Sequence, residues 1–379
     1  MTTRGRKRVV IVCQLDGFGN SVKPIEIQRY LTARGHEVRL VDTYRLSRSA
    51  DGPATGLAVW LPRPKPYHVA LYAIEVIGKL ARPVAVARRR LSYHLLRADF
   101  WLRRRILRSS LALDDVDLVI CETPYDSGLL LDAASVRTMY DCPTPWADEL
   151  LYEGRLTRRQ HTRLRQLEID VFKSVDHLSF HWESYADYVR ERYRISESNL
   201  ATLNWGCSPA AIRARPASPA RVVYFGSLSS RFINLPLLSR LSRSYPYLDV
   251  YGGPPPDPAL GLRYRGYASP GVLREYQFGL ITCIDDPLRR DGFSAKHLDY
   301  LAAGLPVLVP TWRRSAEALA GSLRYDESSF AEVVARHADP VSWQRVSDEA
   351  YAQAEKLRWD DTLRPLDALL DNSASAPQP

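Results

Sequence analysis

The most informative segment of the chain reads Phe293-Ser-Ala-Lys-His-Leu-Asp-Tyr-Leu-Ala-Ala-Gly-Leu-Pro-Val-Leu-Val309. It predicts a short helix that begins at Ser294 and ends before Gly304, because serine favours helix N-caps and glycine favours the left-handed turn beyond a helix end. Apolar residues within it recur at helical spacing and predict one buried face, formed by Leu298, Leu301 and Ala302. The apolar residues that follow predict a buried strand against which this helix packs.

Two charged side chains of this helix indicate a ligand. Lys296 stands in the first turn, where unpaired backbone N–H groups and the helix dipole already favour an anion such as a diphosphate. Asp299 stands one turn later and offers only acceptor atoms, which suits the two hydroxyls of a ribose. The alternative interpretation is an ordinary surface helix whose Lys296 and Asp299 are solvated.

Strand and helix patterns alternate in two successive sets along the chain. Each set opens with a buried strand and a glycine-containing turn, at residues 8–20 and again at residues 221–231. The first set continues with helices at 25–34 and 183–193 and strands at 35–41, 116–121, 136–140 and 177–180. The second set continues with strands at 248–253, 262–267 and 279–284. This alternation predicts two parallel α/β sheets whose ligands bind at the carboxyl ends of the strands.

The helix segment resembles the donor-site helix of GT-B glycosyltransferases, in particular the retaining family 4, whose pattern runs roughly Lys-x-x-Glu-Tyr-x-Ala-x-Gly-x-Pro-Val. Asp299 stands where that family has glutamate. Asp291, eight positions earlier, stands where it has a second glutamate. The segment is also similar to the xanthan-type glucuronosyltransferase, an inverting GT-B enzyme, so the resemblance leaves the stereochemistry open.

The resemblance implies an α/β fold of two Rossmann-like domains that face each other across a cleft. We expect an acceptor-binding domain over residues 1–204 and a nucleotide-sugar-binding domain over residues 205–356. Residues 357–371 are expected to form a helix that crosses back to the first domain, and residues 372–379, rich in Ser, Ala and Pro, a disordered tail.

The resemblance also implies an activity. It is the metal-independent transfer of a hexosyl group from a nucleoside-diphosphate sugar, with UDP as the commonest carrier, to a hydroxyl or amine of a lipid-linked saccharide or natural product. No cofactor is expected. A nucleotide-sugar epimerase on the same fold and a non-catalytic, basic surface-binding protein are the alternatives.

The expected donor site lies in the second domain. The resemblance assigns the diphosphate to the turn Gly226-Ser227, to Arg231 and to Lys296, since fixed cations can stabilise a departing diphosphate without a metal. It assigns the nucleobase to Gly266 and Tyr267, and the ribose and sugar to Asp299 and Asp291.

The expected acceptor site lies in the first domain. An inverting transfer needs a carboxylate or histidine that accepts the proton of the attacking hydroxyl. Asp141, at the end of a predicted buried strand, is the first candidate, followed by Asp148, His181 and Asp16. A structural role is the alternative for His181. A loop after the first strand should line the acceptor side through Asp16, Gly17, Gly19 and Asn20.

The composition narrows the class of protein. The chain has 379 residues, a net charge of +9 and no apolar run near the roughly 20 residues that span a bilayer. Its N-terminus does not resemble a signal peptide, and its five cysteines lack the spacing of metal ligands, so we expect a cytoplasmic protein with reduced thiols. We expect a monomer or weak dimer.

Basic residues concentrate in one window. Residues 62–110 contain twelve Lys or Arg against two Asp or Glu, interleaved at helical spacing with apolar residues that include Phe100 and Trp101. Such a segment suits the anionic inner face of a membrane or a phosphorylated acceptor. A solvated helix is the alternative, and nucleic acid is not expected because no recognised binding motif is present.

Overall fold

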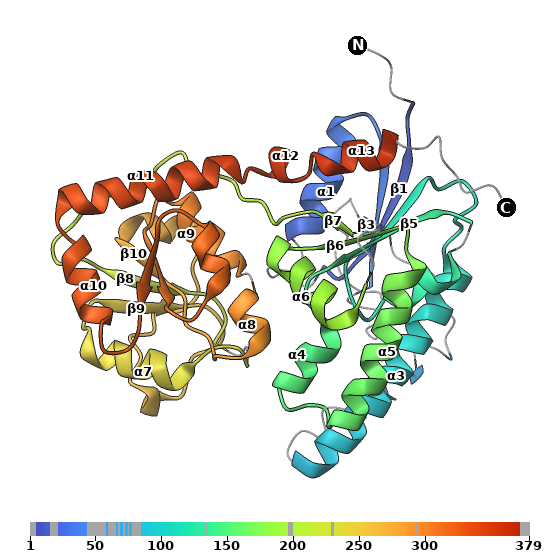
Figure 1. Ribbon diagram of the computed structural model, residues 1–379, viewed down its shortest axis with the longest axis horizontal. Coiled ribbons are helices and arrows are strands. Elements are labelled where there is room, and N and C mark those ends of the chain that lie inside the picture. Colours follow the sequence, from blue (N-terminus) through green and yellow to red (C-terminus); the bar gives the residue numbers. More distant parts are fainter. Residues whose placement is uncertain are drawn as a thin grey trace. The chain divides into compact units, whose positions relative to one another are not determined.

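The computed structural model describes residues 5–15, 22–43, 58–59, 85–133, 135–195, 200–228, 231–292 and 294–371, with scattered positions between 66 and 77. The chain divides into two compact units (Figure 1). Unit 1 comprises Met1–Asn204 and Leu363–Pro379, and unit 2 comprises Trp205–Thr362.

A parallel seven-stranded sheet forms the centre of unit 1, in the order β3-β2-β1-β4-β5-β6-β7. The strands are β1 (Arg8–Cys13), β2 (Glu37–Asp42), β3 (Ala58–Val59), β4 (Leu118–Cys121), β5 (Arg137–Cys142), β6 (His177–Phe180) and β7 (Leu200–Thr202). Every residue of β4 is buried, as expected for a central parallel strand covered on both faces.

Helices cover both faces of this sheet. They are α1 (Val22–Ala33), α3 (Ala85–Ser110), α4 (Trp146–Tyr152), α5 (Arg158–Ser174), α6 (Glu183–Tyr193) and α13 (Pro365–Asp371). Helices α1 and α13 lie on one side, and α3 and α5 on the other (Figure 1). The Tyr30 hydroxyl donates to Asp367 Oδ2 at 3.0 Å, which ties the last helix of the chain to α1.

Unit 2 contains a parallel five-stranded sheet in the order β12-β11-β10-β8-β9. The strands are β8 (Val222–Phe225), β9 (Leu248–Tyr251), β10 (Phe278–Leu280), β11 (Val307–Pro310) and β12 (Ser322–Tyr325). The helices are α7 (Leu235–Ser244), α8 (Pro287–Asp291), α9 (Ala295–Ala302), α10 (Phe330–His337), α11 (Pro340–Lys356) and α12 (Trp359–Thr362). Helices α9 and α11 lie on one side of the sheet and α7 on the other (Figure 1).

Helix α9 forms where the sequence predicts it, with its apolar face buried and Gly304 beyond its end at φ +72°. Ser294 is the N-cap residue as predicted, although its side chain makes no cap hydrogen bond. The strand predicted at 262–267 is wrong. Only Tyr264 forms a bridge, to Val250, although the segment still runs beside β9 through hydrogen bonds between the backbones of Val250 and Arg265 and of Gly252 and Gly266.

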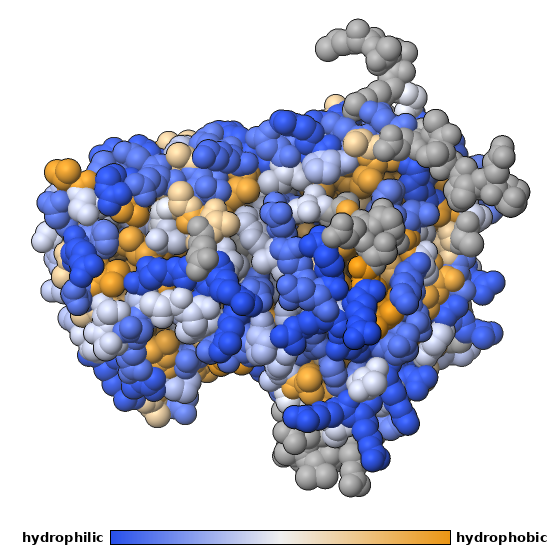
Figure 2. Space-filling view, viewed as in Figure 1, coloured by the Kyte–Doolittle hydropathy of each residue, from blue (hydrophilic) through white to orange (hydrophobic). Residues whose placement is uncertain are grey.

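All five cysteines lie in the described residues, are buried and form no disulfide. Within the described ranges, no helix combines the length and apolar character that crossing a bilayer requires. The face of the molecule visible in Figure 2 is largely hydrophilic.

Candidate functional site

Two glycine turns meet at the carboxyl ends of β8 and β9. Gly226 follows β8 at φ +143°, and a Cβ atom built on it would lie 2.0 Å from Lys296 Cε. Gly252 follows β9, and a Cβ atom there would lie 2.7 Å from the Gly226 carbonyl carbon. Both positions therefore require glycine, because any side chain would separate the two turns from each other or from Lys296.

Lys296 extends from the first turn of α9 over the end of β8. Its Nζ donates to the Tyr224 hydroxyl at 3.0 Å and lies 5.0 Å from the centre of that ring. Burial, with a smaller contribution from the charge of Arg313, lowers the pKa of Lys296 to about 8 against the opposing effects of Cys283 and Asp299. No carboxylate among the described residues pairs with Lys296, so the ammonium group can bind an external anion.

The two aspartates predicted to contact ribose and sugar have different surroundings. Asp299 lies on α9, half-buried, and burial raises its pKa to about 6 while Lys296 opposes the shift. Asp291 ends α8 and accepts from Arg314, whose Nε lies 2.8 Å from Oδ1. The sequence did not predict this ion pair, in which both oxygens of the carboxylate expected to bind the sugar accept from Arg314.

The remaining predicted donor residues lie near the surface of unit 2. Arg231 is exposed. Tyr267 is 79% exposed, and the position beside Gly266 is open, with nothing within 4 Å of a Cβ atom built there. A base could therefore lie against these residues, although no contact with the described residues arranges Tyr267 for stacking.

Sequence reasoning missed Arg313, a buried residue beyond the carboxyl end of β11. Its Nη2 donates to the Gly292 carbonyl, and its Nη1 lies 3.8 Å from Cys283 Sγ. Its position after a buried parallel strand was the available signal, because ligand-binding residues gather at this edge of such sheets.

In unit 1, Asp141 lies at the centre of a buried polar cluster. It sits in β5, fully buried, with Lys23 Nζ 2.6 Å from Oδ2. Ser179 Oγ lies 2.5 Å from Oδ1, and His181 Nε2 lies 3.6 Å from Oδ2. Lys23 also donates to the Leu203 carbonyl at 2.6 Å. The sequence predicted Asp141 and His181 as candidates but missed Lys23, which precedes the helix predicted at 25–34 and lies buried in α1.

The charges in this cluster set its titration. Burial alone would raise the pKa of Asp141, but Lys23 and His181 outweigh it and hold the pKa of this carboxyl below its usual range. Burial, aided by Lys23, lowers the pKa of His181, which is therefore neutral at pH 7. Burial and the Asp141 charge raise the pKa of Glu122, which follows β4 and whose Oε1 has no hydrogen-bond partner. Asp141 is thus held charged, and its role as a catalytic base stays a prediction.

The other predicted acceptor residues do not join this cluster. Asp148 on α4 is buried, 2.5 Å from His161 Nε2, and accepts from the Tyr188 hydroxyl at 2.7 Å. Those bonds connect α4 with α5 and α6. The predicted loop of Asp16, Gly17, Gly19 and Asn20 lies outside the described residues.

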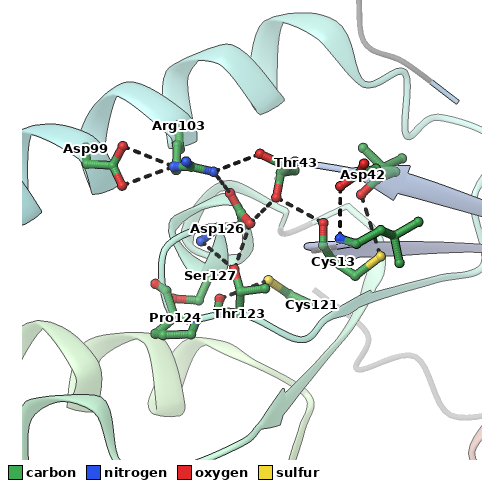
Figure 3. A network of polar contacts seen from close by, with 12 residues as sticks. Cys13, Asp42, Thr43, Asp99, Arg103, Cys121, Thr123, Pro124, Asp126 and Ser127 are labelled. Atoms are coloured by element: carbon green, nitrogen blue, oxygen red, sulfur yellow. Dashed lines mark hydrogen bonds and ion pairs between the residues drawn. The ribbon is translucent and has the colours of Figure 1, made fainter. Parts of the chain in front are cut away.

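The basic window is described mainly through α3. Arg103 points into unit 1, where it bonds Asp99 at 3.1 Å, Asp126 at 3.3 Å and the Thr43 carbonyl at 3.2 Å (Figure 3). Arg104 makes two bonds of 2.6 Å to Asp132. The expectation that Phe100 faces a membrane or acceptor is wrong, because Phe100 belongs to the core, whereas Trp101 is exposed.

Within the described residues, no three His, Cys, Asp or Glu side chains gather as a metal site would require.

Solved structures match this chain over nearly its whole length, whereas no protein-family model and no curated protein sequence matches it. An alpha,alpha-trehalose 6-phosphate synthase from Burkholderia multivorans has a TM-score of 0.64 and 15% identity. A glycosyltransferase from Rickettsia africae has a TM-score of 0.62 and 11% identity. A trehalose-6-phosphate structure from E. coli, bound with UDP-2-fluoro glucose, has a TM-score of 0.62 and 14% identity. Each match covers 98% of this chain and 100% of the other.

These matches show the fold. The chain has the GT-B fold, and the predicted fold class is confirmed. The more specific likeness to glycosyltransferase family 4 and to the xanthan-type enzyme stays a prediction.

Proposed function

We propose that this protein is a glycosyltransferase that binds a UDP-sugar, or another nucleoside-diphosphate sugar, in unit 2. The observation that carries the proposal is Lys296, a lysine without a carboxylate partner among the described residues, held against the Gly226 turn at the carboxyl ends of the strands. A backbone turn and a cation converging at the start of a helix are the groups that bind a diphosphate.

The chemistry follows from the charges. Departure of a nucleoside diphosphate concentrates negative charge on its phosphates, and Lys296 with Arg231 would stabilise that charge without a metal. Asp299 would accept from the ribose hydroxyls, and Gly266 with Tyr267 would contact the base. Asp291 would contact the sugar while it remains paired with Arg314.

Likeness to known structures supports the choice of donor. The matched E. coli structure is bound with UDP-2-fluoro glucose, and a matched synthase from Burkholderia vietnamiensis is described as UDP-forming. UDP-hexoses are therefore the first donors to test. Membership of a family 4-like or xanthan-like subgroup remains part of the proposal.

The acceptor is proposed to bind to unit 1. The cluster of Asp141, His181 and Lys23 provides a carboxylate and an imidazole at neighbouring strand ends, which suits recognition of an acceptor hydroxyl. A lipid-linked saccharide at the inner face of a membrane, or a natural product, would fit the basic window of residues 62–110.

Calorimetry with UDP, UDP-glucose, GDP and dTDP tests the donor site. Wild type should bind at least one of them, and Lys296→Gln should weaken that binding by about 10- to 150-fold, the usual effect of losing a hydrogen bond to a charged group. Arg240→Gln is the matched control, because Arg240 pairs with Glu327 on the exposed surface of the same unit.

Two outcomes would count against the proposal. Absence of binding by wild type to all four nucleotides would favour the surface-binding alternative. Conversion of a bound nucleotide sugar to its epimer without any acceptor would identify an epimerase.

A further inference from the structure

Arg313 is a buried cation for which the described residues supply no counter-charge. The residue is 4% exposed, its Nε has no hydrogen-bond partner, and none of the described carboxylates pairs with its guanidinium. Its recorded partners are the carbonyl of Gly292, Ser315 Oγ and the thiol of Cys283. An arginine cannot lose its proton at physiological pH, so this charge persists in the interior.

The groups around Arg313 do not offset its charge. Burial raises the pKa of the Cys283 thiol despite Arg313, so the sulfur is neutral at pH 7. Burial and the Arg313 charge together lower the pKa of His297 to about 3, so this imidazole is also neutral. Lys296 feels the same positive charge. Among the carboxylates of this region, Asp291 pairs with Arg314. Asp286 accepts from the Arg289 amide through Oδ1 at 2.9 Å, while its Oδ2 has no hydrogen-bond partner and makes no ion pair with Arg313 among the described residues.

A purely structural role does not explain a cation here. Arg313 does tie the loop after β11 to Gly292, the residue that follows Asp291. However, Ser315 Oγ already donates to the same Gly292 carbonyl at 2.6 Å. A neutral side chain could add a second bond of this kind without the unfavourable burial of a charge.

We propose that an oxyanion of the nucleotide-sugar donor supplies the missing counter-charge of Arg313, an inference that rests on the function proposed above. Arg313 would be a specificity-determining residue on the β10–β11 side of the sheet, whereas Lys296 lies over β8. The oxyanion can come from the donor's diphosphate or from a carboxylate on its sugar. A carboxylate and a phosphate each present two negatively charged oxygens that the fork of a guanidinium can bind.

Calorimetry on Arg313→Gln with pyrophosphate, UDP, UDP-glucose and UDP-glucuronic acid distinguishes the two sources. If the diphosphate is the partner, all four ligands should bind roughly 10- to 100-fold more weakly than to wild type. If a sugar carboxylate is the partner, only UDP-glucuronic acid should lose affinity, and wild type should prefer it over UDP-glucose.

Two further variants distinguish loss of ligand binding from loss of the folded structure. Ser315→Ala removes the neighbouring tie to Gly292 and keeps the charge, so it should bind all ligands as wild type does. Arg313→Lys keeps the charge without the guanidinium fork and should lose less affinity than Arg313→Gln. If Arg313→Gln does not fold, Arg313→Lys with measurably weaker binding than wild type is the supporting result.

The inference would be overturned if Arg313→Gln bound all four ligands as tightly as wild type does. If Arg313→Gln does not fold, the same result with Arg313→Lys would overturn it. In either case the proposed donor site would remain intact. An equal loss in Ser315→Ala would overturn the inference too, since that would show a role in shaping the loop only. Failure of wild type to bind any nucleotide would instead overturn the proposed function.

Discussion

The backbone of Gly226 and the side chain of Lys296 occupy adjoining space, with only 2.0 Å between Lys296 Cε and the position that a Cβ atom on Gly226 would take. The strand β8 thus ends in a turn whose shape depends on having no side chain, and the lysine of α9 fills the space left open. This pairing brings together two segments that are far apart in the sequence, the turn after β8 and the first turn of α9, at the proposed diphosphate site.

Replacement of Gly226 with alanine should weaken UDP binding without unfolding unit 2. The new methyl group would meet Lys296, and φ +143° is strained for alanine by about 1–3 kcal/mol. We expect at least a tenfold rise in Kd by calorimetry. Gly271→Ala is the control, because its nearest atom, Ser269 Oγ, lies 3.6 Å away and its φ is ordinary. Equal affinities of the two variants would contradict the assigned role of the turn.

Binding of UDP should weaken as the pH rises through 8. The pKa of Lys296 is lowered from 10.5 to about 8, so the free protein loses this charge above pH 8 and must take up a proton to bind an anion. Between pH 8 and the higher pKa of the bound state, Kd should rise by up to about tenfold per pH unit. Calorimetry from pH 6.5 to 9.5 measures this. A profile for Lys296→Gln as steep as that of wild type would assign the titration to another group.

Asp141 and Lys23 should stabilise unit 1 only as a pair. Both are fully buried, with Nζ 2.6 Å from Oδ2, so Asp141→Leu leaves an uncompensated lysine and should cost about 3–5 kcal/mol in urea unfolding. The double variant Asp141→Leu with Lys23→Met removes both charges and should recover most of this loss. Additive destabilisation by the two substitutions would show that the ion pair is not the cause.

The turnover of the variant Asp141→Asn, compared with wild type, should distinguish an inverting from a retaining mechanism. Asp141→Asn keeps the size of the side chain but cannot accept a proton, and like Asp141→Leu it leaves Lys23 without its counter-charge. In protein that remains folded, an inverting enzyme should lose about 10²–10⁴ in kcat with donor affinity nearly unchanged. In a retaining enzyme the donor phosphate can take the proton, and the loss should be small. Near-normal turnover together with inverted product would direct attention to Glu122, His181 and Asp148.

The start of α3 should bind anionic membranes through charge. We expect a triple variant to bind phosphatidylserine vesicles less tightly, by up to about 1 kcal/mol per charge, in a cosedimentation assay. The variant combines Arg88→Gln, Arg89→Gln and Arg90→Gln. Added salt should weaken binding of wild type in the same way. The control combines Arg158→Gln, Arg159→Gln and Arg163→Gln, three exposed arginines of α5. Equal binding by both triple variants at low salt would refute the membrane proposal.

Local features were predictable where the signals are local. The bounds of β6 and α6 agree with the pattern, and α9 forms between its predicted ends, because hydrophobic periodicity and glycine act over a few residues. The fold class followed from the alternation of strands and helices. The strand predicted at 262–267 is reduced to a single bridge between Tyr264 and Val250.

The sequence by itself determined the two parallel sheets, the strand ends at which side chains gather, and the identity of Lys296 and Asp141 as candidates. Only the tertiary structure decided which charges are paired. Lys23 and Asp141 meet although they lie far apart in the chain, Asp291 is taken by Arg314, and Arg313 is buried without a carboxylate partner among the described residues. The reason is physical: periodicity reports which face of an element is buried, whereas the pKa and partners of a charge depend on distances of a few ångströms set by packing of the whole unit.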